Sequence, residues 1–156
     1  MSAKAGCRFC NLDQASVILS NDHALAIRDG FPVTPGHSLI VTRRHIASLF
    51  EATREEQAAL FELLAEMRQQ LLSFPSKSGL IAVPDGFNIG INDGWPAGQT
   101  VMHLHIHLIP RYTGDTEDPR GGVRWVMPVK APYWKTLAGC GAGRREDTPA
   151  PVRALY

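Results

Sequence analysis

The sequence predicts an α+β fold: an antiparallel sheet of about five strands with one long helix packed on one face. Three observations support this fold class. Apolar residues recur at helical spacing between residues 53 and 75, short runs rich in valine, isoleucine and leucine flank that segment, and three histidines alternate with apolar residues from Val101 to Ile109. Because the strand-like runs follow one another through short turns, an antiparallel meander is favoured.

The first three strands are expected before the helix. Residues 16–20 and 24–27 flank the turn-prone pair Asn21-Asp22, so they are typical of a hairpin. Residues 37–41 supply the third strand.

The helix is expected to begin at a capping box formed by Thr53 and Glu56. It should end at the Ser73-Phe-Pro75 break, because proline cannot continue a helix. The apolar positions are Leu60, Leu63, Leu64, Met67, Leu71 and Phe74. We expect this stripe to pack on the apolar face of the sheet.

The last two strands are expected at residues 87–92 and 102–109. In a strand, side chains alternate between faces and residues rise by ~3.3 Å each, so His103, His105 and His107 would share one face at intervals of roughly 6.6 Å. Leu104 and Ile106 would belong to the other face, under the helix. The histidine row is therefore expected on the face that the helix leaves open.

Three half-buried imidazoles indicate chemistry, because polar rings are costly to bury without partners and imidazole titrates near neutral pH. One interpretation is nucleophilic and acid-base catalysis. The other is a catalytic zinc held by histidines, since His-x-His on a strand can present two ligands to one metal. The residues of the row alone leave both open.

Composition indicates a small-molecule enzyme. The chain has 156 residues, a net charge of +1 and 20% charged residues, so one domain is expected and no basic stripe indicates nucleic acid. No apolar stretch approaches the ~20 residues of a membrane span, and the opening residues lack the apolar core of a signal peptide. We expect a cytoplasmic protein with no nucleic-acid or membrane partner.

The pair Cys7-Arg-Phe-Cys10 has three interpretations: a zinc half-site, a redox pair, or two thiols without a common function. The redox interpretation lacks a thioredoxin-like βαβ context. Zinc would need two more ligands from elsewhere. Cys140, in the Gly-rich tail, is expected to be incidental.

Two blocks of sequence resemble the histidine triad (HIT) superfamily, whose signature is three histidines that alternate with apolar residues. The stretch from Gly98 to Arg111 is most similar to the fragile histidine triad branch, and a second block runs from Pro35 to Val41 and continues to Ile46. The resemblance covers roughly residues 7–115. It implies a HIT domain in residues 1–115. Residues 116–156 are expected to form a loop-rich extension, which the Gly, Pro, Arg and Glu composition from Gly139 to Pro151 predicts to be extended or mobile.

The resemblance implies catalytic roles for four histidines. His105 would attack the α-phosphorus to form a nucleotidyl-histidine, and His107 would assist the departing phosphate. His103 would lie on the other side of the phosphate, and His37 would orient His105 through a hydrogen bond.

The resemblance also implies substrate and metal ligands. Asp29 would bind the ribose hydroxyls, although a turn role for Asp29-Gly30 is the competing interpretation. Ile27 and Leu39 are candidates for contact with adenine. The expected phosphate contacts are Asn92, Gln99 and Thr100. The expected ligands of a structural zinc are Cys7, Cys10, His45 and His103.

The implied activity is hydrolysis of dinucleoside polyphosphates such as diadenosine tri- or tetraphosphate. The first alternative is a nucleoside phosphoramidase, and an alternative of another class is a nucleotide-binding or sensing protein without turnover. A nucleotidyltransferase of the uridylyltransferase type is disfavoured because its signature replaces the third histidine by glutamine. The resemblance further implies a homodimer, with Pro132-Tyr-Trp134 packing across it. In the extension, Arg120 and Arg124 lie on a Gly-rich stretch and either reach terminal phosphates or belong to a solvated loop.

Overall fold

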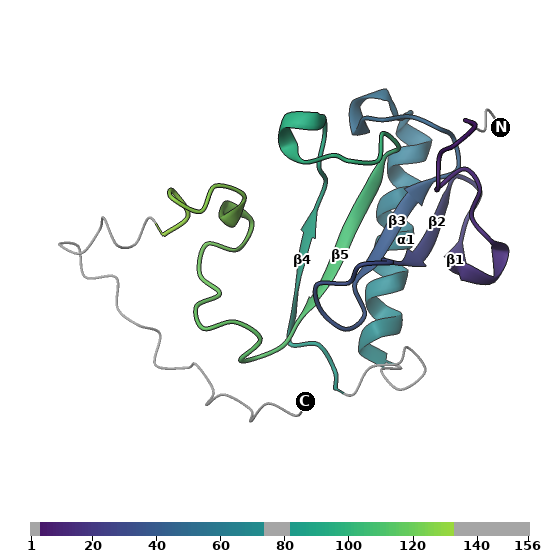
Figure 1. Ribbon diagram of the computed structural model, residues 1–156. Coiled ribbons are helices and arrows are strands. Elements are labelled where there is room, and N and C mark those ends of the chain that lie inside the picture. Colours follow the sequence, from purple (N-terminus) through teal and green to yellow (C-terminus); the bar gives the residue numbers. More distant parts are fainter. Residues whose placement is uncertain (1–3, 74–81, 133–156) are drawn as a thin grey trace.

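The computed structural model describes residues 4–73 and 82–132 and confirms the predicted α+β architecture. Five strands form one antiparallel sheet in the order β1-β2-β3-β5-β4 (Figure 1). The strands are β1 (Val17–Ser20), β2 (Ala24–Arg28), β3 (Ser38–Thr42), β4 (Gly86–Gly90) and β5 (His105–Arg111). The helix α1 spans Arg54–Ser73, and single-turn 3-10 helices cover Gln14–Ser16, Leu49–Glu51, Trp95–Ala97 and Gly122–Val126.

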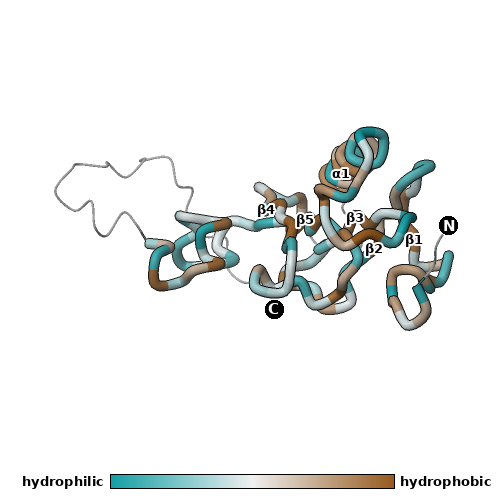
Figure 2. The backbone as a smooth tube through the Cα atoms, turned by 90° about the horizontal axis from the view of Figure 1, so that it is seen from above, coloured by the Kyte–Doolittle hydropathy of each residue, from teal (hydrophilic) through white to brown (hydrophobic). Residues whose placement is uncertain are grey.

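The sheet separates two apolar clusters on its opposite faces. α1 packs on one side of the sheet, against β1, β2 and β3 (Figure 2). The larger cluster joins helix residues such as Leu60 and Met67 to Ile40 and Ile106 of the sheet. The smaller cluster consists of Phe9, Ile27, Leu39 and Val41. The predicted helical stripe is thus confirmed as core, except for Phe74, which lies outside the described residues.

The strand register determines which face of the sheet carries His105 and His107. Leu39 of β3 lies opposite His107, and Val41 lies opposite His105. On the other side of β5, Gly90 of β4 lies opposite His107. Because opposed residues in an antiparallel pair share a face, His105 and His107 lie on the face away from α1, as the alternation predicted.

The capping box is also confirmed. Glu56 N donates to Thr53 Oγ1 at 3.2 Å, and Thr53 N donates to Glu56 Oε2 at 2.9 Å. Glu56 is buried and pairs with Arg44, whose Nη2 lies 2.7 Å from Oε2. This hydrogen bond and charge hold the pKa of Glu56 at about 2. The start of α1 is therefore tied to the loop after β3.

The largest difference from the predicted boundaries is at the start of the last strand. The last strand was expected to span 102–109, but β5 begins at His105. The reason is a tight bend in which His103 N donates to the Val101 carbonyl at 2.8 Å. His103 is therefore not part of the strand row, and its side chain is free to take a different direction.

After β5 the chain continues beside β4, where the short helix Gly122–Val126 contacts that strand (Figure 1). Within the described ranges, no helix has both the length and the apolar character needed to cross a membrane. The expectations about Tyr133, Trp134, Cys140 and the tail from Gly139 lie outside the described residues.

Candidate active site

His105 has one ring nitrogen engaged and the other unprotonated. Its Nδ1 lies 2.8 Å from the carbonyl oxygen of His103. A carbonyl can only accept a hydrogen bond, so Nδ1 must carry the proton and Nε2 must hold a lone pair. The local backbone thus selects the tautomer of His105 that has its nucleophilic nitrogen at Nε2.

His37 and His107 form a second part of the site. Val33 N donates to His37 Nδ1 at 3.4 Å, and His37 Nε2 lies 3.0 Å from His107 Nδ1. Because His37 Nδ1 accepts, its Nε2 carries the proton and donates to His107. The remaining proton of His107 is then on Nε2, so this ring offers a donor beside His105, with the two ring centroids 5.0 Å apart.

This arrangement corrects the expected partner of His37. The sequence analysis assigned His37 to orient His105, but His37 bonds to His107. The register explains the difference, because Leu39 lies opposite His107 and His37 is two residues further along the same face. His105 is oriented instead by the backbone of His103, a contact that side-chain patterns do not report.

Burial keeps both rings of the pair neutral. It lowers the pKa of His107 to about 4, helped by the neighbouring rings of His105 and His37, while the Asp29 carboxylate opposes the shift. The pKa of His37 is also lowered by burial, against the same carboxylate. Near neutral pH both rings are therefore the neutral tautomers that the hydrogen bonds require.

Asp29 contacts both the turn that follows β2 and the pair formed by His37 and His107. Its Oδ1 accepts from Phe31 N at 2.9 Å, which stabilises a turn. Its Oδ2 lies 3.5 Å from His37 Nε2 and 3.9 Å from His107 Nδ1. The carboxylate therefore belongs to the histidine pair as well as to the turn, and its expected ribose contact stays a prediction.

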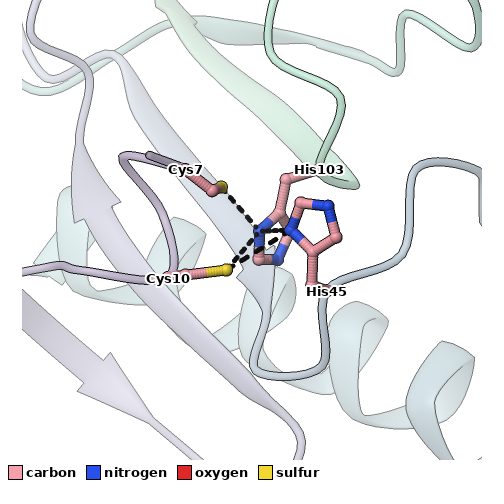
Figure 3. Close-up of side chains that lie close together, drawn as sticks. All are labelled: Cys7, Cys10, His45 and His103. Carbon is pink, nitrogen blue, oxygen red and sulfur yellow. Dashed lines mark hydrogen bonds between the residues drawn. The ribbon is translucent and has the colours of Figure 1, made fainter. Parts of the chain in front are cut away.

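The four expected metal ligands converge on one point (Figure 3). Cys7 and Cys10 come from the N-terminal loop, His45 from the loop after β3, and His103 from the bend before β5. His103 Nδ1 lies 3.4 Å from Cys7 Sγ, 3.7 Å from Cys10 Sγ and 3.3 Å from His45 Nδ1, and Cys10 Sγ lies 3.3 Å from His45 Nδ1.

These separations fit a tetrahedral zinc ion. With Zn–N of ~2.05 Å and Zn–S of ~2.3 Å, a tetrahedron separates two nitrogens by roughly 3.3 Å and a sulfur from a nitrogen by roughly 3.5 Å. The tautomer of His103 fits as well, because its Nε2 donates to the Thr42 carbonyl at 2.8 Å and leaves Nδ1 unprotonated toward the cysteines. A set of two thiols and two imidazoles is typical of closed structural zinc sites.

His103 is fully buried and has both ring nitrogens engaged. These contacts favour a ligand role in place of a phosphate contact for His103, and its position beside the substrate phosphate stays a prediction. The His103 carbonyl oxygen holds His105, so this single residue joins the Cys/His cluster to His105.

A catalytic zinc shared by the three histidines of the row is not supported. Among residues 4–73 and 82–132, the possible ligand groups divide into the Cys/His cluster and the group of Asp29, His37 and His107. Neither group contains His105. The bend at His103 separates the row into two environments.

In the loop before β5, the Gln99 side chain is buried and bonds to the backbone of two other segments. This side chain is 1% exposed, its Oε1 accepts from Gly94 N at 2.8 Å, and its Nε2 donates to the Ala47 carbonyl at 2.8 Å. In this structure both polar atoms of the Gln99 side chain are engaged with the backbone, and its phosphate contact stays a prediction. Asn92 is half-buried, and Thr100 is exposed beside a cavity of about 370 Å³ that Cys7 and His45 also line, so their phosphate contacts stay predictions.

Phe9 is a site residue that the sequence analysis missed. It is buried in the smaller apolar cluster, and its ring centroid lies 5.2 Å from that of His105. It covers Ile27 and Leu39, which are each only 4% exposed. These two residues therefore offer little free surface to adenine. The sequence feature that could have indicated Phe9 is its position between Cys7 and Cys10, because two ligands of one metal would fix the direction of the ring between them.

Arginines at the end of β5 and in the extension bind neighbouring residues. Arg111, the last residue of β5, binds Asp115 and Asn88. Arg120 pairs with Asp118 at 2.8 Å, and Arg124 donates to the Lys130 carbonyl at 3.0 Å. These contacts of Arg120 and Arg124 lie within the extension, and their contact with terminal phosphates stays a prediction.

The chain is similar to proteins of one family. The model of the HIT domain matches residues 12–114. An uncharacterized HIT-like protein of Mycoplasma genitalium is 35% identical over 112 residues, covering 69% of this chain and 74% of that protein. The asymmetrical bis(5'-nucleosyl)-tetraphosphatase of Schizosaccharomyces pombe is 38% identical over 84 residues, covering 54% and 42%. The crystal structure of a zinc-bound histidine triad family protein from Mycobacterium smegmatis has a TM-score of 0.56 at 30% identity, covering 85% of this chain and 97% of that one.

Proposed function

This chain belongs to the HIT domain family, and from that premise we propose that it hydrolyses dinucleoside polyphosphates through a nucleotidyl-histidine on His105. The observation that carries the proposal is the fixed tautomer of His105. With Nδ1–H bound to the His103 carbonyl, the Nε2 lone pair is available without prior deprotonation.

The first step forms a bond between His105 Nε2 and the α-phosphorus, and the bond from that phosphorus to the bridging oxygen breaks. The electron pair of that bond leaves with the remaining phosphates. His107, whose proton lies on Nε2, donates a hydrogen bond to the departing oxygen; it transfers that proton only when the ring has bound a second one, so that a neutral imidazole is left. Water then attacks the phosphorus, the P–N bond breaks, and the mononucleotide is released with His105 restored.

Zinc at Cys7, Cys10, His45 and His103 would have a structural role. The ligand set is closed, so it leaves no position for substrate. The metal would anchor the N-terminal loop to the bend that holds His105. The M. smegmatis relative, described as zinc-bound, supports the same assignment here.

The choice of a dinucleoside polyphosphate is supported by the S. pombe relative, which is a bis(5'-nucleosyl)-tetraphosphatase. The test is chromatographic product analysis after incubation with diadenosine tetraphosphate and, in parallel, with adenosine phosphoramidate. We expect multiple turnovers of the first to AMP and ATP. Preferential release of AMP from the phosphoramidate would contradict the substrate assignment, and turnover of neither would contradict hydrolysis of these substrates.

The nucleophile is tested by His105→Ala. We expect turnover to fall at least about a thousandfold, with AMP still bound, because binding uses other groups. His23→Ala is the matched control, since His23 is exposed at the turn between β1 and β2 and should keep full activity. Substantial residual turnover in His105→Ala would assign the nucleophile to another residue.

A further inference from the structure

Arg8 crosses from the N-terminal loop to the turn that follows β2. It lies between the two cysteines of the metal cluster, and its side chain is exposed. A methyl group placed on Gly30 would lie 3.2 Å from Arg8 Nη2, so the guanidinium rests directly against that glycine. Gly30 is the neighbour of Asp29, the carboxylate that faces His37 and His107.

The guanidinium also lies over the ring of Phe9. Arg8 Cζ is 5.5 Å from the centroid of that ring, and the ring in turn lies 5.2 Å from His105. Phe9 therefore contacts both Arg8 and His105. Of the three side chains, Arg8 is the most exposed to solvent.

In the part of the chain that the structure describes, no carboxylate forms an ion pair with Arg8. The ion pairs found there join other residues, and none places a carboxylate on Arg8. Asp29, the nearest acidic residue in sequence to Gly30, directs Oδ2 to the histidine pair and Oδ1 to Phe31 N. A flat cation with free donors is thus held at the edge of the site.

The proposed function fixes which end of a nucleotide comes to this edge. The α-phosphorus is placed at His105, and the ribose is expected at Asp29. Because the ribose joins the phosphate to the base in every nucleotide, the base lies within one nucleotide length of both His105 and Asp29. Arg8 lies within that reach, since its guanidinium contacts the glycine next to Asp29 and the Phe9 ring that contacts His105.

Resting on the proposed function, we infer that Arg8 is a nucleobase-binding residue whose guanidinium stacks on the base. Guanidinium planes stack on aromatic faces more effectively than ammonium groups do. The contact would be sequence-tolerant among bases, because every base has an aromatic face. Its position between Cys7 and Cys10 means that the metal cluster holds Arg8 in place.

The test is a comparison of ligands that differ in the base. Isothermal titration gives the affinities of AMP, adenosine and ribose 5-phosphate for the full chain and for Arg8→Ala. We expect Arg8→Ala to weaken AMP and adenosine by about fivefold to thirtyfold and to leave ribose 5-phosphate unchanged. Equal loss for ribose 5-phosphate would mean a phosphate contact and would overturn the inference, as would no loss for AMP.

Two further variants separate stacking from charge and from folding. Arg8→Lys keeps the charge but not the plane, so we expect it to resemble Arg8→Ala; full AMP affinity in Arg8→Lys would overturn the stacking contact. Arg54→Ala, an exposed arginine at the start of α1 on the other face of the sheet, is the matched control. Zinc content and thermal stability are measured for each variant to confirm that the fold is kept.

A double-mutant cycle with Gly30→Ala tests the contact itself. The added methyl displaces the guanidinium, and Gly30 has no left-handed backbone that would strain the substitution. We expect Gly30→Ala to weaken AMP binding in the wild-type background and to have a smaller effect with Arg8→Ala, since coupled residues are not additive. Additive effects would contradict the contact. These affinities need no turnover, so a failure of the hydrolase assay is distinguishable from a failure of this inference.

Discussion

At the scale of single residues, four histidines have their ring protons placed by a backbone group or by a neighbouring ring. The His103 carbonyl fixes the tautomer of His105, the Thr42 carbonyl fixes that of His103, and Val33 N fixes that of His37, which in turn donates to His107. The three histidines of the row therefore stand in three different environments, and the proposed function gives them three roles: nucleophile, metal ligand and donor to the leaving group.

The charge beside the histidine pair supports a prediction for Asp29→Asn. Burial lowers the pKa of His107 to about 4, and the Asp29 carboxylate opposes that shift, so its removal should lower the pKa further. A smaller fraction of His107 then carries the second proton that it can transfer to the leaving oxygen. We expect turnover of diadenosine tetraphosphate to fall on the order of tenfold or more.

The effect of the charge is separated from an effect on folding by measuring the hydrolysis rate of a substrate with a better leaving group. A p-nitrophenyl ester of AMP needs little proton donation, so Asp29→Asn should hydrolyse it at nearly the wild-type rate. Because an asparagine side chain still accepts and donates hydrogen bonds, ribose binding should be kept. Equal losses for both substrates would show that Asp29 acts by positioning the ribose rather than through His107.

At the scale of elements, the predictable features were those that follow from periodicity. Side-chain alternation located β5 and its face, and the Thr53 and Glu56 pair located the start of α1. The bend at His103 was not predicted because it depends on a backbone hydrogen bond to Val101 and on contacts with residues of distant loops. The contacts of the Gln99 side chain were not predictable for the same reason, since its partners Gly94 and Ala47 are backbone groups.

The N-terminal loop is the element whose position depends on the metal cluster. Cys7→Ser removes one of four ligands, so we expect less bound zinc and a lower melting temperature before any direct effect on the chemical step. Cys140→Ser is the matched cysteine control and should retain the zinc. Metal analysis of protein purified without chelator, together with thermal unfolding, measures both. Full zinc content in Cys7→Ser would remove this residue from the ligand set.

At the scale of the whole molecule, β4 is an edge strand with one neighbour, β5. An edge strand presents unpaired backbone groups that another strand can join, and Ile89 in its middle is 43% exposed. The family resemblance implies a homodimer, and pairing of β4 with its copy would extend the sheet across the pair.

A charge on this edge tests the dimer. Ile89→Lys places an ammonium group near its own copy across a two-fold axis and removes apolar contact area, as natural edge lysines do. We therefore expect sedimentation velocity to show a shift from dimer toward monomer at micromolar concentration. Phe61→Lys is the matched control, because Phe61 is 52% exposed on α1, on the other face of the sheet, and should leave the assembly unchanged. A dimer that survives Ile89→Lys but is lost in Phe61→Lys would place the interface on α1 and would contradict pairing of β4 with its copy.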